Sequence, residues 1–152
     1  MAEDGQRFWE DIEVGEVHRQ GPHLVTEEAI IRFAEQFDPQ YFHLSREGGE
    51  RGPFGKLSAS GWHSCSIAMR LMVDGMLTTM VSQGAPGVKS VRWLKPTFVD
   101  DELTLVTEIA DKFPSNSRPQ IGFCFAKHRL EDQHGTTKMV MENNFMIGRR
   151  PS

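Results

Sequence analysis

The sequence predicts an α+β fold in which an antiparallel sheet wraps around a long central helix, as one domain over residues 1–152. Three observations support this class. Residues 27–37 have the pattern of an amphipathic helix, residues 60–83 have that of a mostly buried helix, and the chain after Pro86 is a series of strand-like runs. One further run, residues 16–25, precedes the first helix and adds a strand.

The first helix has a clear start and a clear end. Thr26 supplies an N-cap hydroxyl, and two glutamates follow it where the helix dipole favours negative charge. Pro39 disfavours helical geometry at Asp38, so the helix is expected to end there. Apolar residues at helical spacing predict one buried face, made of Ile30, Phe33, Ala34 and Phe37.

A long connection and a second helix follow. Residues 38–57 leave room for one short helical turn, and a connection of this length is uncommon unless it has a function. The second helix is expected to run from about Ser60 to a stop at Gly84. Its methionines are interpreted as core packing rather than as a cofactor site: Met69, Met72, Met76 and Met80.

The remaining chain predicts four consecutive antiparallel strands. Turn residues separate four runs that are rich in β-branched and aromatic side chains, at 87–99, 101–113, 118–132 and 136–150. Together with residues 16–25 they give a sheet large enough to cover the second helix on one side.

Composition narrows the function classes. A hydrophobic fraction of 38% and a charged fraction of 25% are typical of a soluble globular protein, and the net charge of −4 provides no basic field for nucleic acid. The acidic N-terminus and the absence of a long apolar run argue against a signal peptide or a membrane span, so a cytoplasmic protein is expected. Cys65 and Cys124 are far apart, which favours buried thiols over a disulfide or a zinc site.

Several segments together resemble the MaoC-like dehydratases, also called (R)-specific enoyl-CoA hydratases. They keep the family's order and spacing and read "FWEDIEVGEV", "LVTEEAIIRFAEQFDPQYFHL", "PFGKLSASGWHSCSIAMRLMVD" and "SVRWLKPTFVDDELTL". The resemblance implies the hot dog fold, a homodimer or a dimer of dimers, and reversible hydration of a 2-enoyl-CoA in fatty acid metabolism. The coenzyme A thioester is then the substrate, and no cofactor is expected.

The same resemblance assigns three catalytic positions. The family has an aspartate and a histidine five positions apart around an Asn-Pro pair, and Asp38 and His43 keep that spacing. Here the proline directly follows the aspartate, Gln40 stands in place of asparagine, and Ser45 stands where an acidic residue often occurs. Gly61 matches the glycine whose backbone N–H serves the family as oxyanion donor.

The chemistry of hydration fits these residue types. It needs a base for water, an acid for the α carbon, and a donor to the enolate-like oxygen of the thioester. His43 can act as base near neutral pH, while Asp38 holds the water and shares the proton transfer, with the division between them left open. The helix end and flanking aromatic residues are expected to raise the pKa of Asp38 and favour proton donation.

Other readings of these residues stay open. An Asp-Pro pair is also a common helix stop, and a loop histidine is often structural. A metal bound by Asp38, His43 and His63 is conceivable, but hydration needs none. Arg92 and Lys95 could meet coenzyme A phosphates or form a solvated strand face. The expected substrate-binding set is Tyr41, Phe42, Phe54, Ser60, Trp62 and Arg92.

Two alternative functions follow from the same fold. One is an acyl-CoA thioesterase, which would use a carboxylate to activate water against the thioester carbonyl. The other is a non-catalytic acyl-CoA binding subunit, suggested by the departures at Gln40 and Ser45.

Overall fold

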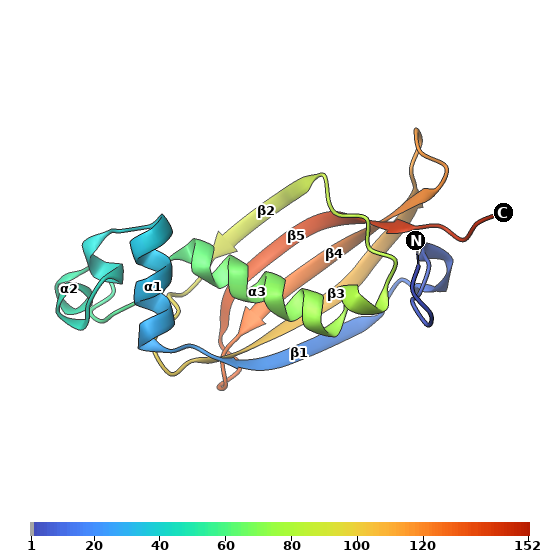
Figure 1. The fold of residues 1–152 in the computed structure, drawn as a ribbon. Coiled ribbons are helices and arrows are strands. Elements are labelled where there is room, and N and C mark those ends of the chain that lie inside the picture. Colours follow the sequence, from blue (N-terminus) through green and yellow to red (C-terminus); the bar gives the residue numbers. More distant parts are fainter. Residues whose placement is uncertain (1) are drawn as a thin grey trace.

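The structure is a computed structural model that describes residues 2–152. The chain forms one strand, then three helices, and then four more strands, and the five strands make a single sheet (Figure 1). The helices are α1 (Glu27–Phe37), α2 (Arg46–Arg51) and α3 (Gly61–Gly75), with single 3-10 turns at Trp9–Asp11, Tyr41–His43 and Leu77–Thr79. The strands are β1 (Val17–Leu24), β2 (Gly87–Trp93), β3 (Glu102–Pro114), β4 (Ile121–Glu131) and β5 (Thr137–Gly148).

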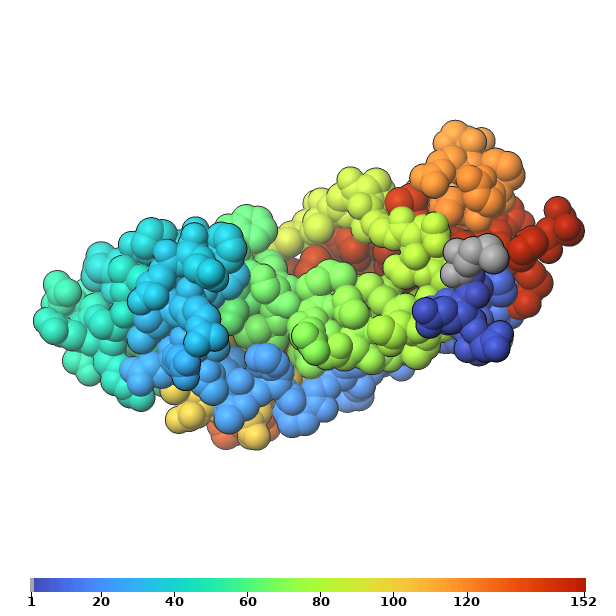
Figure 2. Space-filling model, viewed as in Figure 1, coloured from blue at the N-terminus to red at the C-terminus, as the bar shows by residue number. Residues whose placement is uncertain are grey.

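The sheet is antiparallel throughout and has the strand order β1-β3-β4-β5-β2. Helix α3 lies along one face of this sheet, and both chain ends lie at the end of the molecule away from α1 and α2 (Figure 1). In the space-filling view, α1 and α2 form one lobe beyond the N-terminal end of α3 (Figure 2). This arrangement confirms the predicted α+β fold with a sheet around a central helix.

The hydrophobic core lies between α3 and the sheet. Alternate residues of β3, β4 and β5 point toward the helix, as the two-residue period of a strand requires. They include Leu103, Leu105 and Ile109 of β3, Ala126 and Leu130 of β4, and Met139 and Phe145 of β5, which pack with Ile67, Ala68 and Leu71 of α3. The alternation fixes the strand register, because a shift by one residue would turn this apolar set outward.

Helix α1 begins and ends where the sequence predicts. The Thr26 hydroxyl accepts a hydrogen bond from the backbone N–H of Ala29, and Asp38 is the first residue outside helical geometry. Its predicted apolar face is only partly buried, because Ile30 and Ala34 are enclosed while Phe37 is 71% exposed at the open end of the helix. The prediction for Phe37 is therefore wrong.

The central helix is shorter than expected. It ends at Gly75 rather than Gly84, and Met76 takes a non-helical backbone conformation. The chain then forms bridges from Met80 to Arg7 and from Ser82 to Ile147, so this apolar segment closes the end of the core in an extended conformation. The preceding connection, residues 38–57, also differs, since it contains both a 3-10 turn and α2 instead of one helical turn.

Two further expectations have outcomes in the structure. Both cysteines are free thiols, with Cys124 fully buried and Cys65 only partly so. Within residues 2–152, no helix combines the length and the apolar character needed to cross a membrane.

Candidate active site

A pocket of about 350 Å³ opens at the N-terminal end of α3. Three segments meet there: the residues that follow α1, the start of α3, and the residues that follow β2. The side chains that bound the pocket are those of Asp38, Gln40, Phe42, His43, Phe54, Ala59, Ser60, Trp62, Ser64, Trp93, Leu94, Lys95, Pro96 and Thr97, together with the backbone of Gly61. Its size is at the lower end of the range for small-molecule sites.

His43 is held with one ring nitrogen fixed and the other facing the pocket residues. The 3-10 turn Tyr41–His43 turns the imidazole inward, and the side chain is only 4% exposed. Its Nδ1 lies 2.5 Å from the carbonyl oxygen of Ser58. A carbonyl can only accept, so Nδ1 carries the hydrogen and Nε2 is the nitrogen left for chemistry. That Nε2 lies 3.4 Å from Oδ2 of Asp38.

Asp38 is stabilised in its charged form. Burial alone would raise the pKa of its carboxyl, but hydrogen bonds from Ser60 and Gln40, with His43 beside it, lower that pKa below its ordinary value. The Gln40 amide Nε2 donates to Oδ1 at 2.8 Å. The expectation that the pKa is raised is therefore wrong, because local donors outweigh the desolvation and the helix end. Asp38 is a carboxylate at neutral pH and accepts hydrogen bonds.

Gly61 presents a backbone donor at the positive end of the helix dipole. It is the first residue of α3, and the N-cap Ser60 uses its hydroxyl oxygen for the N–H of Trp62, at 3.3 Å. The Gly61 N–H itself has no acceptor in the part of the chain that the structure describes. A side chain cannot be placed here, since a Cβ would lie 2.6 Å from the indole of Trp93, whose Nε1 donates to the Gly61 carbonyl at 2.8 Å. The geometry therefore suits a small anion-stabilising site.

Most of the predicted site residues meet in this pocket. Asp38, His43 and Gly61 border it together with Phe42, Phe54, Ser60 and Trp62. Tyr41 and Arg92 do not line it, whereas Lys95 does. His63 does not line the pocket; it stacks on Phe33 with ring centroids 4.8 Å apart, and burial lowers its pKa to about 4. Within residues 2–152, Asp38, His43 and His63 therefore do not form the three-ligand metal site that is conceivable from the sequence.

Several residues in or next to the site were not identified from the sequence. Ser58 orients His43, Trp93 packs on Gly61, and Ser64 and Thr97 line the inner part of the pocket. Trp93 and Thr97 lie in residues 91–98, where Arg92 and Lys95 are the side chains that sequence alone links to a coenzyme A phosphate. Ser58 acts mainly through its backbone carbonyl, which leaves no signal in the amino-acid sequence, while its hydroxyl lies 3.5 Å from the same His43 nitrogen.

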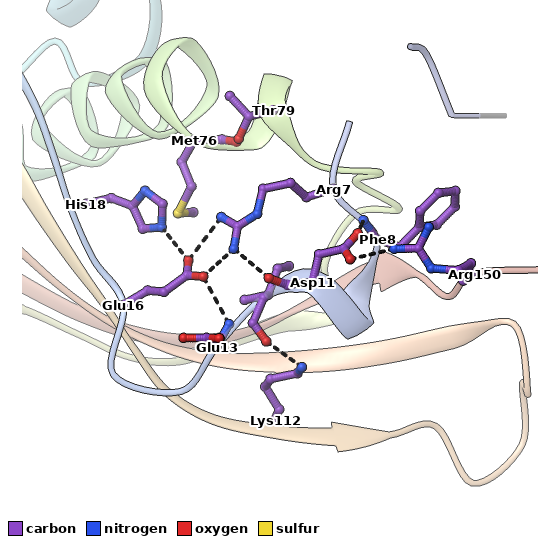
Figure 3. A network of polar contacts seen from close by, with 11 residues as sticks. Arg7, Phe8, Asp11, Glu13, Glu16, His18, Met76, Thr79, Lys112 and Arg150 are labelled. Atoms are coloured by element: carbon purple, nitrogen blue, oxygen red, sulfur yellow. Dashed lines mark hydrogen bonds and ion pairs between the residues drawn. The ribbon is translucent and has the colours of Figure 1, made fainter. Parts of the chain in front are cut away.

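A second polar cluster lies at the other end of the core (Figure 3). The Glu16 carboxylate sits between the guanidinium of Arg7 and the imidazole of His18, with His18 Nε2 at 3.0 Å. Burial opposes ionisation of Glu16, but the hydrogen bonds from Arg7, the Glu13 backbone and His18 lower its pKa to about 2. All of these partners are protein groups, so this cluster fastens the N-terminal segment to the sheet rather than exposing a reactive group.

The fold and the pocket define a class of protein. A five-stranded antiparallel sheet around a central helix is the hot dog fold, and the pocket at the helix start holds an Asp–His pair beside a free backbone donor. The family model described as "MaoC like domain" matches residues 11–120, which is more than half of the chain. The chain belongs to the MaoC-like domain family.

Individual relatives agree with this assignment. A MaoC-like dehydratase from Rhodospirillum rubrum has 34% sequence identity and a TM-score of 0.85, covering 96% of this chain and 99% of its own. An (R)-hydratase from Pseudomonas aeruginosa shares the fold, with a TM-score of 0.78 at 19% identity, over 94% of this chain and 86% of its own. The uncharacterized protein YdeM of Bacillus subtilis is 30% identical over 71% of this chain and 77% of its own length.

Proposed function

We propose that this protein is a hydratase/dehydratase that adds water reversibly to a 2-enoyl-CoA thioester and gives a 3-hydroxyacyl-CoA. The observation that supports this best is the placement of the Asp38 carboxylate, the free Nε2 of His43 and the unpaired N–H of Gly61 around one pocket. These are the acceptor, the base and the oxyanion donor that hydration requires. Membership of a family that contains dehydratases adds weight to the proposal.

In the proposed reaction, the Asp–His pair holds the water that attacks the substrate. Asp38 Oδ2 and His43 Nε2 are both acceptors, and they lie 3.4 Å apart on the same pocket wall. One water can donate a hydrogen to each of them, which leaves its oxygen lone pairs directed at the β carbon of the substrate. As the oxygen bonds to that carbon, one of the pair takes a proton from the water, and the pair delivers a proton to the α carbon. The net change is addition of water, and the pair returns to its starting state.

Gly61 accounts for the charge that develops on the thioester. Attack at the β carbon moves electrons through the double bond onto the thioester oxygen, which becomes enolate-like. The free N–H of Gly61 at the start of α3 is a fixed donor for that oxygen. Donors of this kind typically contribute about 3–4 kcal/mol to lowering a reaction barrier.

A homodimer is part of the proposal. β2 is an edge strand that pairs only with β5 within the described chain, and Val88, Trp93 and Leu94 at this edge are exposed apolar residues. A second copy that pairs along β2 would satisfy the edge and cover this apolar surface. Trp93 and Leu94 also border the pocket, so the partner would lie beside the acyl-CoA. Light scattering at micromolar concentration should give twice the chain mass or a multiple of it, and a monomer mass would contradict this part of the proposal.

Crotonyl-CoA provides the direct test of the activity. Loss of the enoyl absorbance without release of a thiol indicates hydration, which is the expected result. Release of free coenzyme A would instead support the thioesterase alternative, in which the Asp38 carboxylate would activate the water. Binding without any turnover across a panel of enoyl chain lengths would support a binding subunit and contradict the proposal.

A further inference from the structure

The pocket is bordered by a buried pair of hydroxyl side chains. Among the residues that line it, Phe54 and Trp62 are exposed, whereas Ser64 and Thr97 are only 3% and 2% exposed, and this buried pair is called the floor below. The Ser64 hydroxyl donates to the Thr97 hydroxyl at 3.0 Å. A pocket for an unsubstituted alkyl chain gains from an apolar floor, so a buried pair of hydroxyls at this position calls for a different ligand.

The hydroxyl pair has one hydrogen to spare. Two hydroxyls carry two hydrogens, and the contact between Ser64 and Thr97 uses one of them. From residue 2 to residue 152, no protein acceptor receives the hydrogen of the Thr97 hydroxyl. Leaving a buried donor unsatisfied is unfavourable, so this hydrogen is a donor available to whatever fills the pocket.

The donor lies where the acyl chain of a bound thioester would reach. Ser64 is one turn along α3 from Gly61 and on the same face of the helix. If the thioester oxygen binds at the Gly61 N–H, the Ser64–Thr97 pair is about 5 Å further along the helix axis. This distance corresponds to the carbons just beyond the reacting double bond.

The floor is rigid. The Thr97 carbonyl accepts a hydrogen bond from the N–H of Ala59 at 2.8 Å, which ties it to the segment before α3. The adjacent Pro96 carbonyl accepts from Nζ of Lys138 at 3.0 Å, and this buried lysine also pairs with Asp101 at 3.2 Å. A donor held from both sides is pre-organised, so a ligand loses little by ordering it.

We propose that Thr97, supported by Ser64, is a specificity-determining residue that selects a short acyl group carrying a hydrogen-bond acceptor near its end. This inference deepens the proposed function and rests on it for the placement of the thioester. The acceptor can be a hydroxyl, carbonyl or carboxylate oxygen, because each accepts from the Thr97 hydroxyl. An apolar chain of the same length leaves the Thr97 donor unsatisfied and is disfavoured.

A matched pair of saturated thioesters tests this without turnover. 4-Hydroxybutanoyl-CoA and pentanoyl-CoA have acyl chains of equal length and differ by a hydroxyl in place of a methyl group. Calorimetric titration of the wild type should give about 10-fold tighter binding of the hydroxylated thioester. Succinyl-CoA, measured alongside, shows whether a carboxylate is preferred to a neutral acceptor.

Three variants locate the preference. Thr97→Val keeps the shape and removes the hydroxyl, so the ratio of the two dissociation constants should fall to about 1. Thr97→Ser keeps the hydroxyl and should keep most of the preference. Thr136→Val, at an exposed position in the turn between β4 and β5, is the matched control and should change neither dissociation constant.

The outcomes separate the inference from the proposed function. Equal binding of the two thioesters by the wild type, or an unchanged ratio in folded Thr97→Val, overturns the inference even if crotonyl-CoA is hydrated. A preference that disappears in Thr97→Val supports the inference even if no enoyl-CoA is hydrated. If Thr97→Val fails to fold, Thr97→Ala removes the same hydroxyl and takes its place in the comparison, with Thr97→Ser as the variant that keeps the hydroxyl.

Discussion

Two buried histidines, His43 and His128, have nearly the same exposure and opposite prospects for chemistry. His43 is 4% exposed and His128 is 2% exposed. In the sheet core, His128 has Nδ1 at 2.8 Å from the Thr107 hydroxyl and Nε2 at 2.8 Å from the Asn143 side-chain oxygen. An amide oxygen can only accept, so Nε2 donates to it and Nδ1 accepts from the hydroxyl, which fixes a neutral ring.

The difference between the two histidines is the partner of the second nitrogen. At His128 both nitrogens are occupied by neutral protein groups, and burial lowers its pKa, so the ring has no lone pair to offer. At His43 the second nitrogen faces a carboxylate in a pocket and can take a hydrogen from a water or a substrate. Burial therefore does not distinguish a catalytic histidine from a structural one. The distinguishing feature is a ring nitrogen whose lone pair is not already used in a hydrogen bond from the protein.

The largest effect is expected from breaking the structural histidine. His128→Ala leaves a cavity and removes the partners of Thr107 and Asn143, which should lower the free energy of unfolding by about 3 kcal/mol. Turnover per folded molecule should stay near the wild-type value. Denaturant unfolding and an activity assay corrected for the folded fraction check both statements. A loss of turnover without a loss of stability would contradict the structural role of His128.

The second effect tests the backbone donor by displacing it while both histidines stay in place. Gly61→Ala puts a Cβ against the Trp93 indole, so the backbone at this border of the pocket has to shift. Turnover should fall by about 10- to 100-fold. The control is Gly135→Ala at the β4–β5 turn, which meets no neighbouring atom and should change turnover little even though its positive φ introduces local strain. Equal turnover of Gly61→Ala and the wild type would contradict the oxyanion role.

A third histidine supplies a pH test. Burial and the nearby His23 lower the pKa of His63 from 6.5 to about 4, so protonation favours the unfolded chain. The stability contribution of neutral His63 is full above pH 6.5 and is lost as the pH falls toward 4. His63→Phe keeps the stacking on Phe33 and should flatten the melting temperature over that interval. An unchanged slope would show that His63 does not titrate there.

The smallest expected effect is on the pH dependence of stability, and it concerns the carboxylate of Glu16. Like His128, Glu16 has protein partners on every side, and its pKa falls from 4.5 to about 2. Its stability contribution is complete above pH 4.5 and is lost as the pH falls toward 2, below the window of His63. Glu16→Gln should flatten the melting temperature below pH 4.5 only, by an amount reduced by solvent screening. A change confined to higher pH would contradict the assignment.

Much of the fold was predictable because its signals are local. The hydroxyl of Thr26 and the Asp-Pro pair mark the ends of α1, and the alternation of apolar residues marks the strands. The end of α3 was not predictable, since Met76 and Met80 continue a helical apolar pattern while long-range bridges to Arg7 and Ile147 draw the chain out of the helix. Tertiary pairing overrides propensity in such segments.

In the site, as in the fold, features set by nearby residues were predictable and features set by distant segments were not. The five-residue spacing of Asp38 and His43 survives folding because a 3-10 turn returns the histidine to the aspartate. The direction of the Asp38 pKa shift was mispredicted, because the helix end is close in sequence while the decisive donor Ser60 comes from another segment. Thr97 was missed for a similar reason, since it reaches the pocket only through the connection that follows β2.

The most direct test of the account compares Asp38→Asn, His43→Ala and the double variant in the hydration of crotonyl-CoA. If both groups act on one water and one α carbon, each single change lowers turnover by about 100-fold or more, and the double variant is little worse than the poorer single one. Melting curves for every variant exclude loss of folded protein as the cause. Two folded single variants with near-normal turnover would show that Asp38 and His43 are a helix stop and a structural histidine, as His128 is.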